Sequence, residues 1–189
     1  MRERFIHRLI TNAMLCFLSL PSFTLSLQAQ RNVHASLIGQ EQRKAAPAFQ
    51  LSGTNQKTVR LSTFQGQVVL LNFWATTCGG CLLEIPDLVQ IQKDNQKNHF
   101  SAIGVSADRV YGGTKTEQKA LSLVKSFLSG NKLNYPVVIG NERVINSYEF
   151  RSYPATYLID KHGRIAASYV GIISKENVEA NVALLLKEQ

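Results

Sequence analysis

The chain has 189 residues, which is enough for one folded domain with a short extension. Its 21 Lys and Arg outnumber its 13 Asp and Glu, giving a formal net charge of +8. The basic residues are scattered, and beyond the first 29 residues Arg43-Lys44 is their single adjacent pair, so the charge pattern does not favour nucleic-acid binding.

The first 29 residues have the layout of an export signal. Three arginines within the first eight residues precede an apolar run over residues 9–20, which Pro21 ends. This arrangement is typical of a secretory signal peptide, and cleavage after Ala29 fits it. Signal peptides prefer a small residue two positions before the last residue of the signal, and Leu27 at that position is larger. An uncleaved signal anchor through residues 9–20 is therefore the alternative. Both interpretations predict a periplasmic or otherwise extracytoplasmic protein.

The remaining sequence predicts a linker followed by one α/β domain. Residues 30–45 are polar and mixed, as in a linker, and residues 46–189 alternate apolar stretches with turn signals. The elements expected in chain order are a hairpin over 48–61, a strand over 67–74, a helix from Cys78 to about 98, a strand over 100–106, a helix over 117–128, a strand over 135–139, a helix over 142–148, two paired strands over 156–159 and 165–169, and a helix over 175–187. The near-continuous apolar run at 67–74 suits a central strand buried on both faces.

Two cysteines three positions apart, Cys78 and Cys81, follow this strand at the start of a helix. There the helix dipole and free N–H groups favour a thiolate, the attacking species in disulfide exchange. Cys16 falls in the signal segment, so an exported chain keeps one close pair, which indicates a redox-active disulfide. An inert structural disulfide is the alternative. No second cysteine pair or paired histidines exist, and Leu82 stands where haem attachment needs His, so no metal or cofactor is expected.

The motifs around this pair, taken in order, resemble the thioredoxin superfamily over about residues 45–188. They are Pro47-Ala48-Phe49, Gly66-Gln67-Val68-Val69-Leu70-Leu71-Asn72-Phe73-Trp74-Ala75, Cys78-Gly79-Gly80-Cys81, Glu84, Pro86, Tyr153-Pro154-Ala155-Thr156-Tyr157-Leu158-Ile159-Asp160 and Gly163. Within the superfamily the chain resembles exported TlpA/ResA-type thiol–disulfide proteins, which include the cytochrome c maturation thioredoxins. The resemblance implies an α/β thioredoxin fold with a central mixed β-sheet flanked by helices, an N-terminal β-hairpin extension and an inserted strand–helix segment.

Three residues are the candidate catalytic groups. Cys78, exposed at the strand–helix turn, would be the nucleophile, and Cys81, one turn later and more buried, would resolve the mixed disulfide. Glu84 lies three residues after Cys81, and helix periodicity alone leaves it as a solvated surface carboxylate. The resemblance implies instead a buried carboxyl with a raised pKa that exchanges protons with the cysteines.

The resemblance also implies substrate contacts. The Tyr153–Pro154 bond would be cis and face the cysteines, with the Tyr153 backbone pairing with an extended substrate segment. An ordinary trans proline at a strand start is the alternative. Thr77, Gly79 and Gly80 would also contact the substrate, and they depart from the family. Members of the family usually have Trp directly before the first cysteine, and often have Pro as the second of the two residues between the cysteines.

Three further residues are expected to shape the site. Trp74 would pack in the core beside the active-site turn. Asn72 would either hydrogen-bond near the buried cysteine or be a plain buried amide. Pro86 should kink the helix, because it lacks an N–H and clashes with the preceding turn.

These observations predict an exported enzyme that reduces disulfides in protein substrates through a Cys78/Cys81 dithiol–disulfide cycle. Because the compartment is oxidising, a membrane-embedded thiol donor would restore the dithiol, and apocytochrome c is the substrate that the resemblance implies. A disulfide oxidant or isomerase of the same fold is the first alternative. A thiol peroxidase is the second, although Ala75-Thr76-Thr77 does not supply the upstream Pro/Thr arrangement. A non-catalytic thioredoxin-fold binding module is the third.

Overall fold

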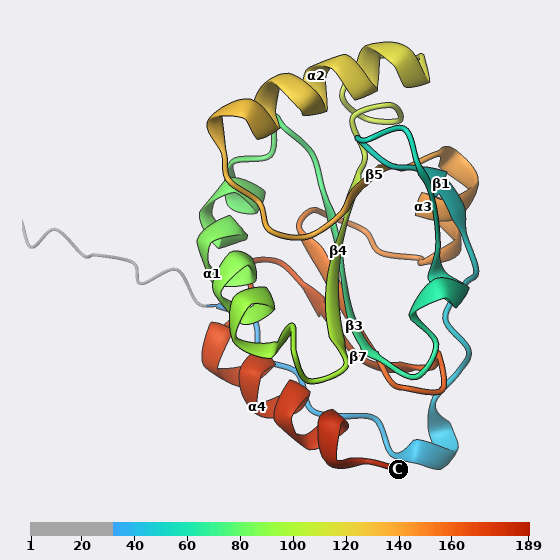
Figure 1. Ribbon diagram of the computed structural model, residues 1–189, viewed down its shortest axis with the longest axis vertical. Coiled ribbons are helices and arrows are strands. Elements are labelled where there is room, and N and C mark those ends of the chain that lie inside the picture. The colour runs from blue at the N-terminus through green and yellow to red at the C-terminus, as the bar shows by residue number, and fades with distance from the viewer. Residues whose placement is uncertain (1–31) are drawn as a thin grey trace, which may run out of the picture. The chain divides into compact units, whose positions relative to one another are not determined.

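A five-stranded mixed sheet forms the centre of the domain in the computed structural model, which describes residues 32–189 (Figure 1). The strand order is β5–β4–β3–β6–β7. The strands are β3 (Val68–Trp74), β4 (Phe100–Ser106), β5 (Val137–Ile139), β6 (Ala155–Ile159) and β7 (Ile165–Val170). β3, β4 and β5 run parallel, whereas β6 is antiparallel to β3 and β7 is antiparallel to β6. The mixed-sheet thioredoxin fold predicted from the sequence is confirmed.

Two layers cover the faces of this sheet. On one face lie α1 (Gly79–Asn95), α2 (Glu117–Gly130) and α4 (Lys175–Lys187). On the other lie the hairpin of β1 (Gln50–Ser52) and β2 (Thr58–Arg60), the short helix η2 (Leu61–Phe64) and α3 (Glu142–Ser147). In Figure 1, α1 and α4 are to the left of the sheet and the hairpin and α3 to its right. The predicted N-terminal hairpin is therefore present and packs on the face opposite α1.

β3 lies in the middle of the sheet, and all seven of its residues are buried. Its side chains alternate between the two faces, as the two-residue period of a strand requires. Those of Val68, Leu70 and Trp74 pack under α1, α2 and α4, and the intervening apolar ones pack under the hairpin and α3. Asn72 has the same parity as Leu70 and Trp74, so its amide lies on the α1 side of the sheet.

The predicted helices and strands are all present, with small shifts at their ends. The largest shift is at α1, which ends at Asn95 rather than near residue 98. The Asn95 amide donates to the Ile91 carbonyl at 2.9 Å, and His99 has a positive φ of 54°, so the chain leaves the helix early and turns into β4. Pro86 lies inside α1 and does not end it.

Residues 32–45 are packed into the domain, in contrast to the linker predicted over 30–45. Val33 forms a bridge with Ile173, and Ala45 forms one with Arg164. The polar composition of the segment does not predict this packing, because the partners of its buried Arg43 are distant in the sequence. The predicted signal segment lies outside the described residues. Within residues 32–189, no helix combines the length and apolar character needed to cross a membrane.

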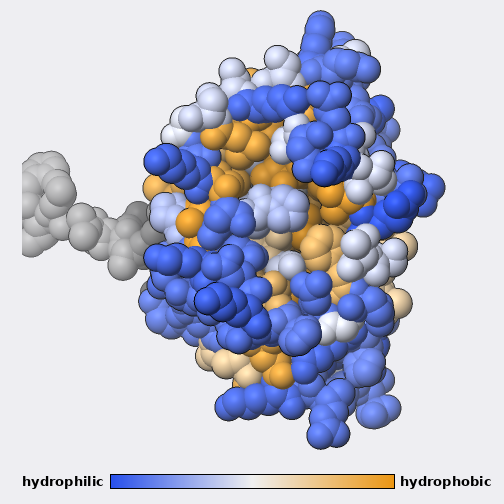
Figure 2. Space-filling model, in the orientation of Figure 1, coloured by the Kyte–Doolittle hydropathy of each residue, from blue (hydrophilic) through white to orange (hydrophobic). Residues whose placement is uncertain are grey.

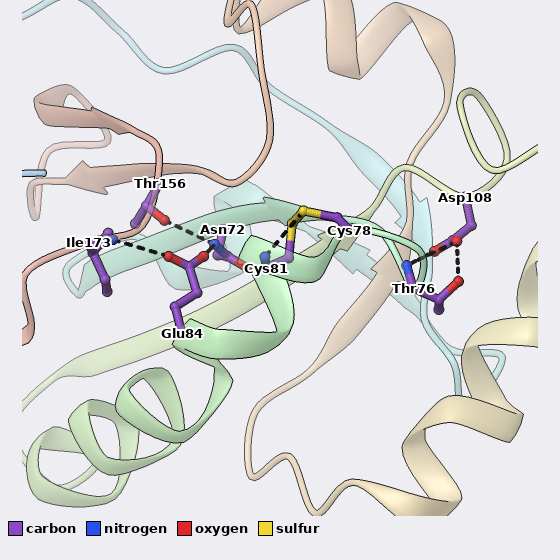
Figure 3. The surroundings of a disulfide bond; sticks show 8 residues. All are labelled: Asn72, Thr76, Cys78, Cys81, Glu84, Asp108, Thr156 and Ile173. Carbon is purple, nitrogen blue, oxygen red and sulfur yellow. Dashed lines mark hydrogen bonds between the residues drawn. A yellow bond between two sulfur atoms is a disulfide. The ribbon is translucent and has the colours of Figure 1, made fainter. Parts of the chain in front are cut away.

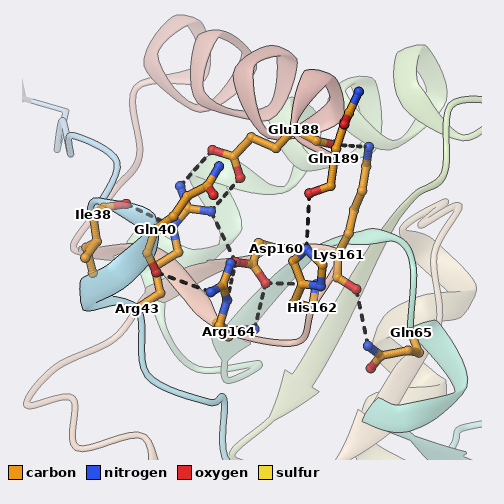
Figure 4. Close-up of polar contacts among 10 residues, drawn as sticks. All are labelled: Ile38, Gln40, Arg43, Gln65, Asp160, Lys161, His162, Arg164, Glu188 and Gln189. Atoms are coloured by element: carbon orange, nitrogen blue, oxygen red, sulfur yellow. Dashed lines mark hydrogen bonds and ion pairs between the residues drawn. The ribbon is translucent and has the colours of Figure 1, made fainter.

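A buried ion cluster joins this N-terminal segment to the end of the chain (Figure 4). The Arg43 guanidinium donates to Asp160 Oδ2 at 3.1 Å and to Glu188 Oε1 at 2.8 Å. Arg164 also donates to Asp160, through its backbone N–H and its Nε, at 2.9 Å each. Burial by itself would raise the pKa of Asp160, but these hydrogen bonds together lower it below its ordinary value. The cluster follows β6, at the end of the sheet away from the cysteines.

Replacing Arg43 by Met is expected to lower the free energy of unfolding by about 3 kcal/mol at pH 7, because the buried Asp160 carboxylate keeps only Arg164 as a cationic partner and the partly buried Glu188 loses Arg43. Urea denaturation measures this. The loss should shrink as the pH falls toward 4 and below, because the carboxylates with lowered pKa values become protonated there. Lys175→Met is the control, since Lys175 pairs with Glu179 at 3.6 Å on the surface and should change stability by less than about 1 kcal/mol. Equal losses for the two variants would contradict a stabilising cluster.

Candidate active site

The two cysteines lie at the carboxyl end of the central strand β3, where the chain enters α1 (Figure 3). Cys78 is the N-cap residue of α1, and it forms a disulfide with Cys81 in the first turn, with an S–S distance of 2.05 Å. The Cys78 Sγ also accepts the Cys81 backbone N–H at 3.2 Å. Cys78 is partly exposed, whereas Cys81 is 1% exposed. Cys78 is therefore accessible from solvent at a helix N-terminus, a position that favours a thiolate in the reduced form, whereas Cys81 is covered.

A buried carboxylate that was not predicted from the sequence holds the turn before Cys78. Asp108 is 0% exposed and accepts hydrogen bonds from the Thr76 N–H at 3.1 Å and the Thr76 hydroxyl at 2.6 Å (Figure 3). The Ser106 hydroxyl donates a third at 2.8 Å. The signal for it was a Ser-x-Asp pattern directly after an apolar strand, at the carboxyl end of a parallel sheet, where functional sites gather. Asp108 thereby positions the backbone from which Cys78 projects.

Glu84 is a second buried carboxyl, one helical turn after Cys81. It is 0% exposed, so the alternative of a solvated surface carboxylate is wrong. Burial raises the pKa of Glu84 to about 7, although hydrogen bonds from the Ile173 N–H at 3.3 Å and the Asn72 amide at 2.7 Å act in the opposite direction. A carboxyl with this pKa can both give and take a proton near neutral pH.

Asn72 connects α1 to the neighbouring strand β6. Its Nδ2 donates to Glu84 Oε1 at 2.7 Å and to the Thr156 hydroxyl at 2.9 Å (Figure 3). The side-chain hydrogen bonds of Asn72 thus go to Glu84 and Thr156 rather than to a cysteine. Thr156 is fully buried, and its role in this network was not predicted from the sequence. Together these side chains form a buried polar network that holds the Glu84 carboxyl in one orientation.

The residues predicted to contact substrate gather around the disulfide. The Tyr153–Pro154 bond is cis, as the resemblance implies. A Cβ placed on Gly80 would lie 3.5 Å from the Pro154 Cδ, so the proline ring lies against the turn between the cysteines. Gly79 faces open space, and Thr77 is exposed. These positions thus surround Cys78 without covering it.

Trp74 and Pro86 have different surroundings. Trp74 is 2% exposed, and its ring centroid lies 5.1 Å from that of Phe127 on α2, so it is a packing residue beside the active-site turn. Pro86 lies in α1 with an exposed side chain. Among residues 32–189 no three His, Cys, Asp or Glu side chains are grouped so that they could hold a metal ion.

Apolar side chains reach the surface around the start of α1. Leu82 and Leu83, directly after Cys81, are 38% and 62% exposed. Figure 2 shows further hydrophobic residues among hydrophilic ones in the upper half of its face, where α1 and α2 lie. Exposed apolar side chains beside a reactive sulfur suit contact with another protein.

The sequence and the fold both match known thiol–disulfide proteins. The thiol-disulfide oxidoreductase ResA of Bacillus subtilis (strain 168) is 33% identical over 141 residues, covering 74% of this chain and 73% of ResA. The thioredoxin-like protein YneN of the same organism is 30% identical over 147 residues, covering 78% of this chain and 82% of YneN.

Solved structures give the same picture. The exposed lipoprotein thioredoxin Etrx1 of Streptococcus pneumoniae strain TIGR4 superposes with a TM-score of 0.64 at 29% identity, covering 74% of this chain and 100% of Etrx1. A thiol:disulfide interchange protein of Chlorobium tepidum TLS has a TM-score of 0.65 at 25% identity, covering 76% of this chain and 97% of that one. Residues 43–168 also match the AhpC/TSA family over most of the domain. This chain therefore belongs to the AhpC/TSA family, and within it to the ResA-like thiol–disulfide oxidoreductases with a thioredoxin fold.

Proposed function

We propose that this protein is exported and reduces disulfides in protein substrates. The observation that carries the proposal is the asymmetric cysteine pair, with Cys78 partly exposed at a helix N-terminus and Cys81 buried one turn from a buried Glu84. This asymmetry suits a reaction in which one sulfur meets the substrate and the other acts only afterwards.

The reaction takes two exchange steps. In the first, the Cys78 thiolate attacks one sulfur of the substrate disulfide, and the S–S bond breaks with its electron pair on the other substrate sulfur, which takes up a proton. In the second, the Cys81 sulfur attacks Cys78 Sγ, loses its own proton and releases the second substrate thiol. The substrate gains two electrons and two protons, and the enzyme keeps a Cys78–Cys81 disulfide.

Glu84 is the proposed proton acceptor in the second step. Cys81 is 1% exposed, so its proton has no direct path to water, and Glu84 follows one helical turn later. With a pKa of about 7, the Glu84 carboxylate can take that proton and return it in the next cycle. Asn72 would keep the carboxyl oriented through its 2.7 Å hydrogen bond.

Substrate binding is assigned to the surface around Cys78. The Tyr153 backbone, next to Pro154, would pair with an extended substrate segment as an added strand does. Thr77, Gly79 and Gly80 would line the other side of the reacting sulfurs. Gly79 has open space around it, so substrate backbone can approach closely there.

The proposed location is outside the cytoplasm. The first 29 residues would act as a signal peptide or signal anchor, and Etrx1, one of the similar solved structures, is described as an exposed lipoprotein thioredoxin. In an oxidising compartment a reductase needs a steady supply of electrons, so a membrane-embedded thiol donor would restore the Cys78/Cys81 dithiol. Apocytochrome c is the substrate proposed from the TlpA/ResA resemblance.

The equilibrium reduction potential of the Cys78–Cys81 pair in the full chain, titrated in thiol redox buffers, tests the proposal. A value near that of thioredoxin, about −270 mV, is expected for a reductase. A value near about −120 mV, as in strong oxidants, would reverse the direction to disulfide formation or shuffling. Absence of a reversible transition would favour a non-catalytic binding module, and rapid consumption of peroxide in a parallel assay would favour a thiol peroxidase.

A further inference from the structure

A row of aromatic rings runs from the core to the surface beside the active site. Phe73 of β3 lies 4.8 Å from Phe150, Phe150 lies 5.0 Å from Tyr153, and Tyr153 lies 5.6 Å from Tyr111, measured between ring centroids. The last two contacts are edge-to-face, with interplanar angles of 73° and 65°, a geometry that aromatic pairs favour. Tyr111 ends the row and is 62% exposed.

The loop that carries Tyr111 is tied to the turn before the disulfide. The Tyr111 N–H donates to the Ala107 carbonyl at 2.9 Å, and the Ala107 N–H donates to the Trp74 carbonyl at 2.8 Å. The Asp108 carboxylate accepts the Thr76 N–H at 3.1 Å. Two separate sets of hydrogen bonds therefore fix the base of this loop to the chain between β3 and α1.

The residues of the loop that follow Tyr111 are hydrogen-bonded to the backbone of Asp108. The Gly112 N–H and the Thr114 hydroxyl donate to the Asp108 carbonyl, at 3.1 Å and 2.8 Å. A Cβ on Gly112 would lie 2.7 Å from the Asp108 backbone, so only glycine fits there, and Gly113 has a φ of +72°. The loop is thus held compactly, and the Tyr111 ring is preorganised on the surface.

We propose that Tyr111 determines substrate specificity by contacting the substrate segment that flanks the disulfide being reduced. The proposal rests on the reduction of protein disulfides proposed above. Pro154 lies against Gly80 between the cysteines, and Tyr153 precedes it. A segment that pairs with the Tyr153 backbone therefore runs beside the ring of Tyr111, which is in edge contact with Tyr153.

The substrate side chain that this surface selects is large and apolar or aromatic. Thr77, the exposed residue before Cys78, is small and polar, so the exposed Tyr111 ring, in edge contact with the partly buried Tyr153, supplies the aromatic surface on this side of the site. A ring fixed in advance loses little freedom on binding, so it favours a matching side chain more than a mobile ring would. A substrate with glycine beside its cysteine would gain nothing from the same surface.

The test uses the reduced full-length protein and short peptides, each joined through its single cysteine as a disulfide dimer. One peptide has Phe on both sides of the cysteine, and a second has Gly there. The disulfide of 2-mercaptoethanol serves as a small substrate without flanking residues. Second-order rate constants are measured for the wild type, Tyr111→Ala and Tyr111→Phe, with Leu184→Ala as control, since Leu184 is 53% exposed on α4.

Tyr111→Ala is expected to slow reduction of the Phe peptide about tenfold and to leave the Gly peptide and the small disulfide unchanged. Tyr111→Phe and Leu184→Ala should match the wild type, and all variants should keep its reduction potential. An unchanged Phe-to-Gly preference in Tyr111→Ala would overturn the proposal, as would equal slowing of all three substrates, which indicates a structural role. A wild type that reduces no disulfide at all would instead refute the proposed function.

Discussion

Cys78→Ser is expected to abolish disulfide exchange, with a loss of rate of more than about 1,000-fold. The reason is that a hydroxyl at the N-cap of α1 can neither ionise near neutral pH nor form a mixed disulfide. The measurement is single-turnover reduction of a peptide disulfide by the reduced full-length protein. The stability of the variant should be compared with that of the reduced wild type, because closing this short loop contributes about 2 kcal/mol to the oxidised form.

The two cysteines should fail in different ways. Cys81→Ser keeps the partly exposed Cys78, so it is expected to attack the substrate and then stop as a mixed disulfide, visible as an adduct of the substrate mass. Cys78→Ser should give no adduct on Cys81, because that thiol is 1% exposed. Cys16→Ser is the matched control and should exchange normally. Full activity of Cys78→Ser, or an adduct on Cys81 in that variant, would contradict the assigned roles.

Glu84→Gln is expected to slow the second exchange step about 100-fold at pH 7 and to leave the first step nearly unchanged. The amide keeps the shape of the side chain but cannot accept the proton that Cys81 must lose. Rapid quenching of the mixed disulfide separates the two steps. In the wild type the rate of the second step should rise with pH around an inflection near 7, the pKa of Glu84, and this inflection should vanish in the variant. Equal slowing of both steps would indicate a general structural effect.

The same carboxyl should make stability depend on pH. The pKa of Glu84 is raised from its ordinary 4.5 to about 7, so between these values the folded state holds a proton that the unfolded state has lost. The free energy of unfolding of the oxidised protein should therefore fall by about 3 kcal/mol as the pH rises from 4.5 to 7, and level off above that range. Glu84→Gln should remove this decline, whereas Glu179→Gln, at a partly exposed carboxylate on α4, should retain it. An identical pH profile for Glu84→Gln and the wild type would show that burial does not perturb Glu84.

Local features of the sequence were sufficient to predict the elements and the cysteine pair. A short, near-continuous apolar run suits a strand covered on both faces, and a Cys-x-x-Cys segment after it places one sulfur at a helix N-terminus. The resemblance added the cis bond before Pro154, which local spacing leaves undecided. These predictions depend on residues close together in the chain, so their signal is present in the order of the amino acids.

Other parts of the protein depend on contacts between distant residues. Whether Glu84 faces water or the core was ambiguous, because helix periodicity tells which residues share a face and not what covers it. The covering groups are Asn72 from β3, Thr156 from β6 and the Ile173 backbone, which come together only when the sheet is assembled. The Ser-x-Asp pattern at Asp108 is local, but it does not reveal that this carboxylate accepts a hydrogen bond from Thr76, 32 residues away.

The order of amino acids by itself determined the strands, the helices and the reactive cysteine pair. The reason is that hydrophobic periodicity and residue type are local signals, which can be read from a few neighbouring residues. Only the tertiary structure decided which polar groups are buried. Residues 32–45 pack into the domain rather than forming a linker because Arg43 reaches Asp160 and Glu188, 117 and 145 residues away. A buried charge is tolerated only where its partners are in place, and that placement is a property of the folded chain.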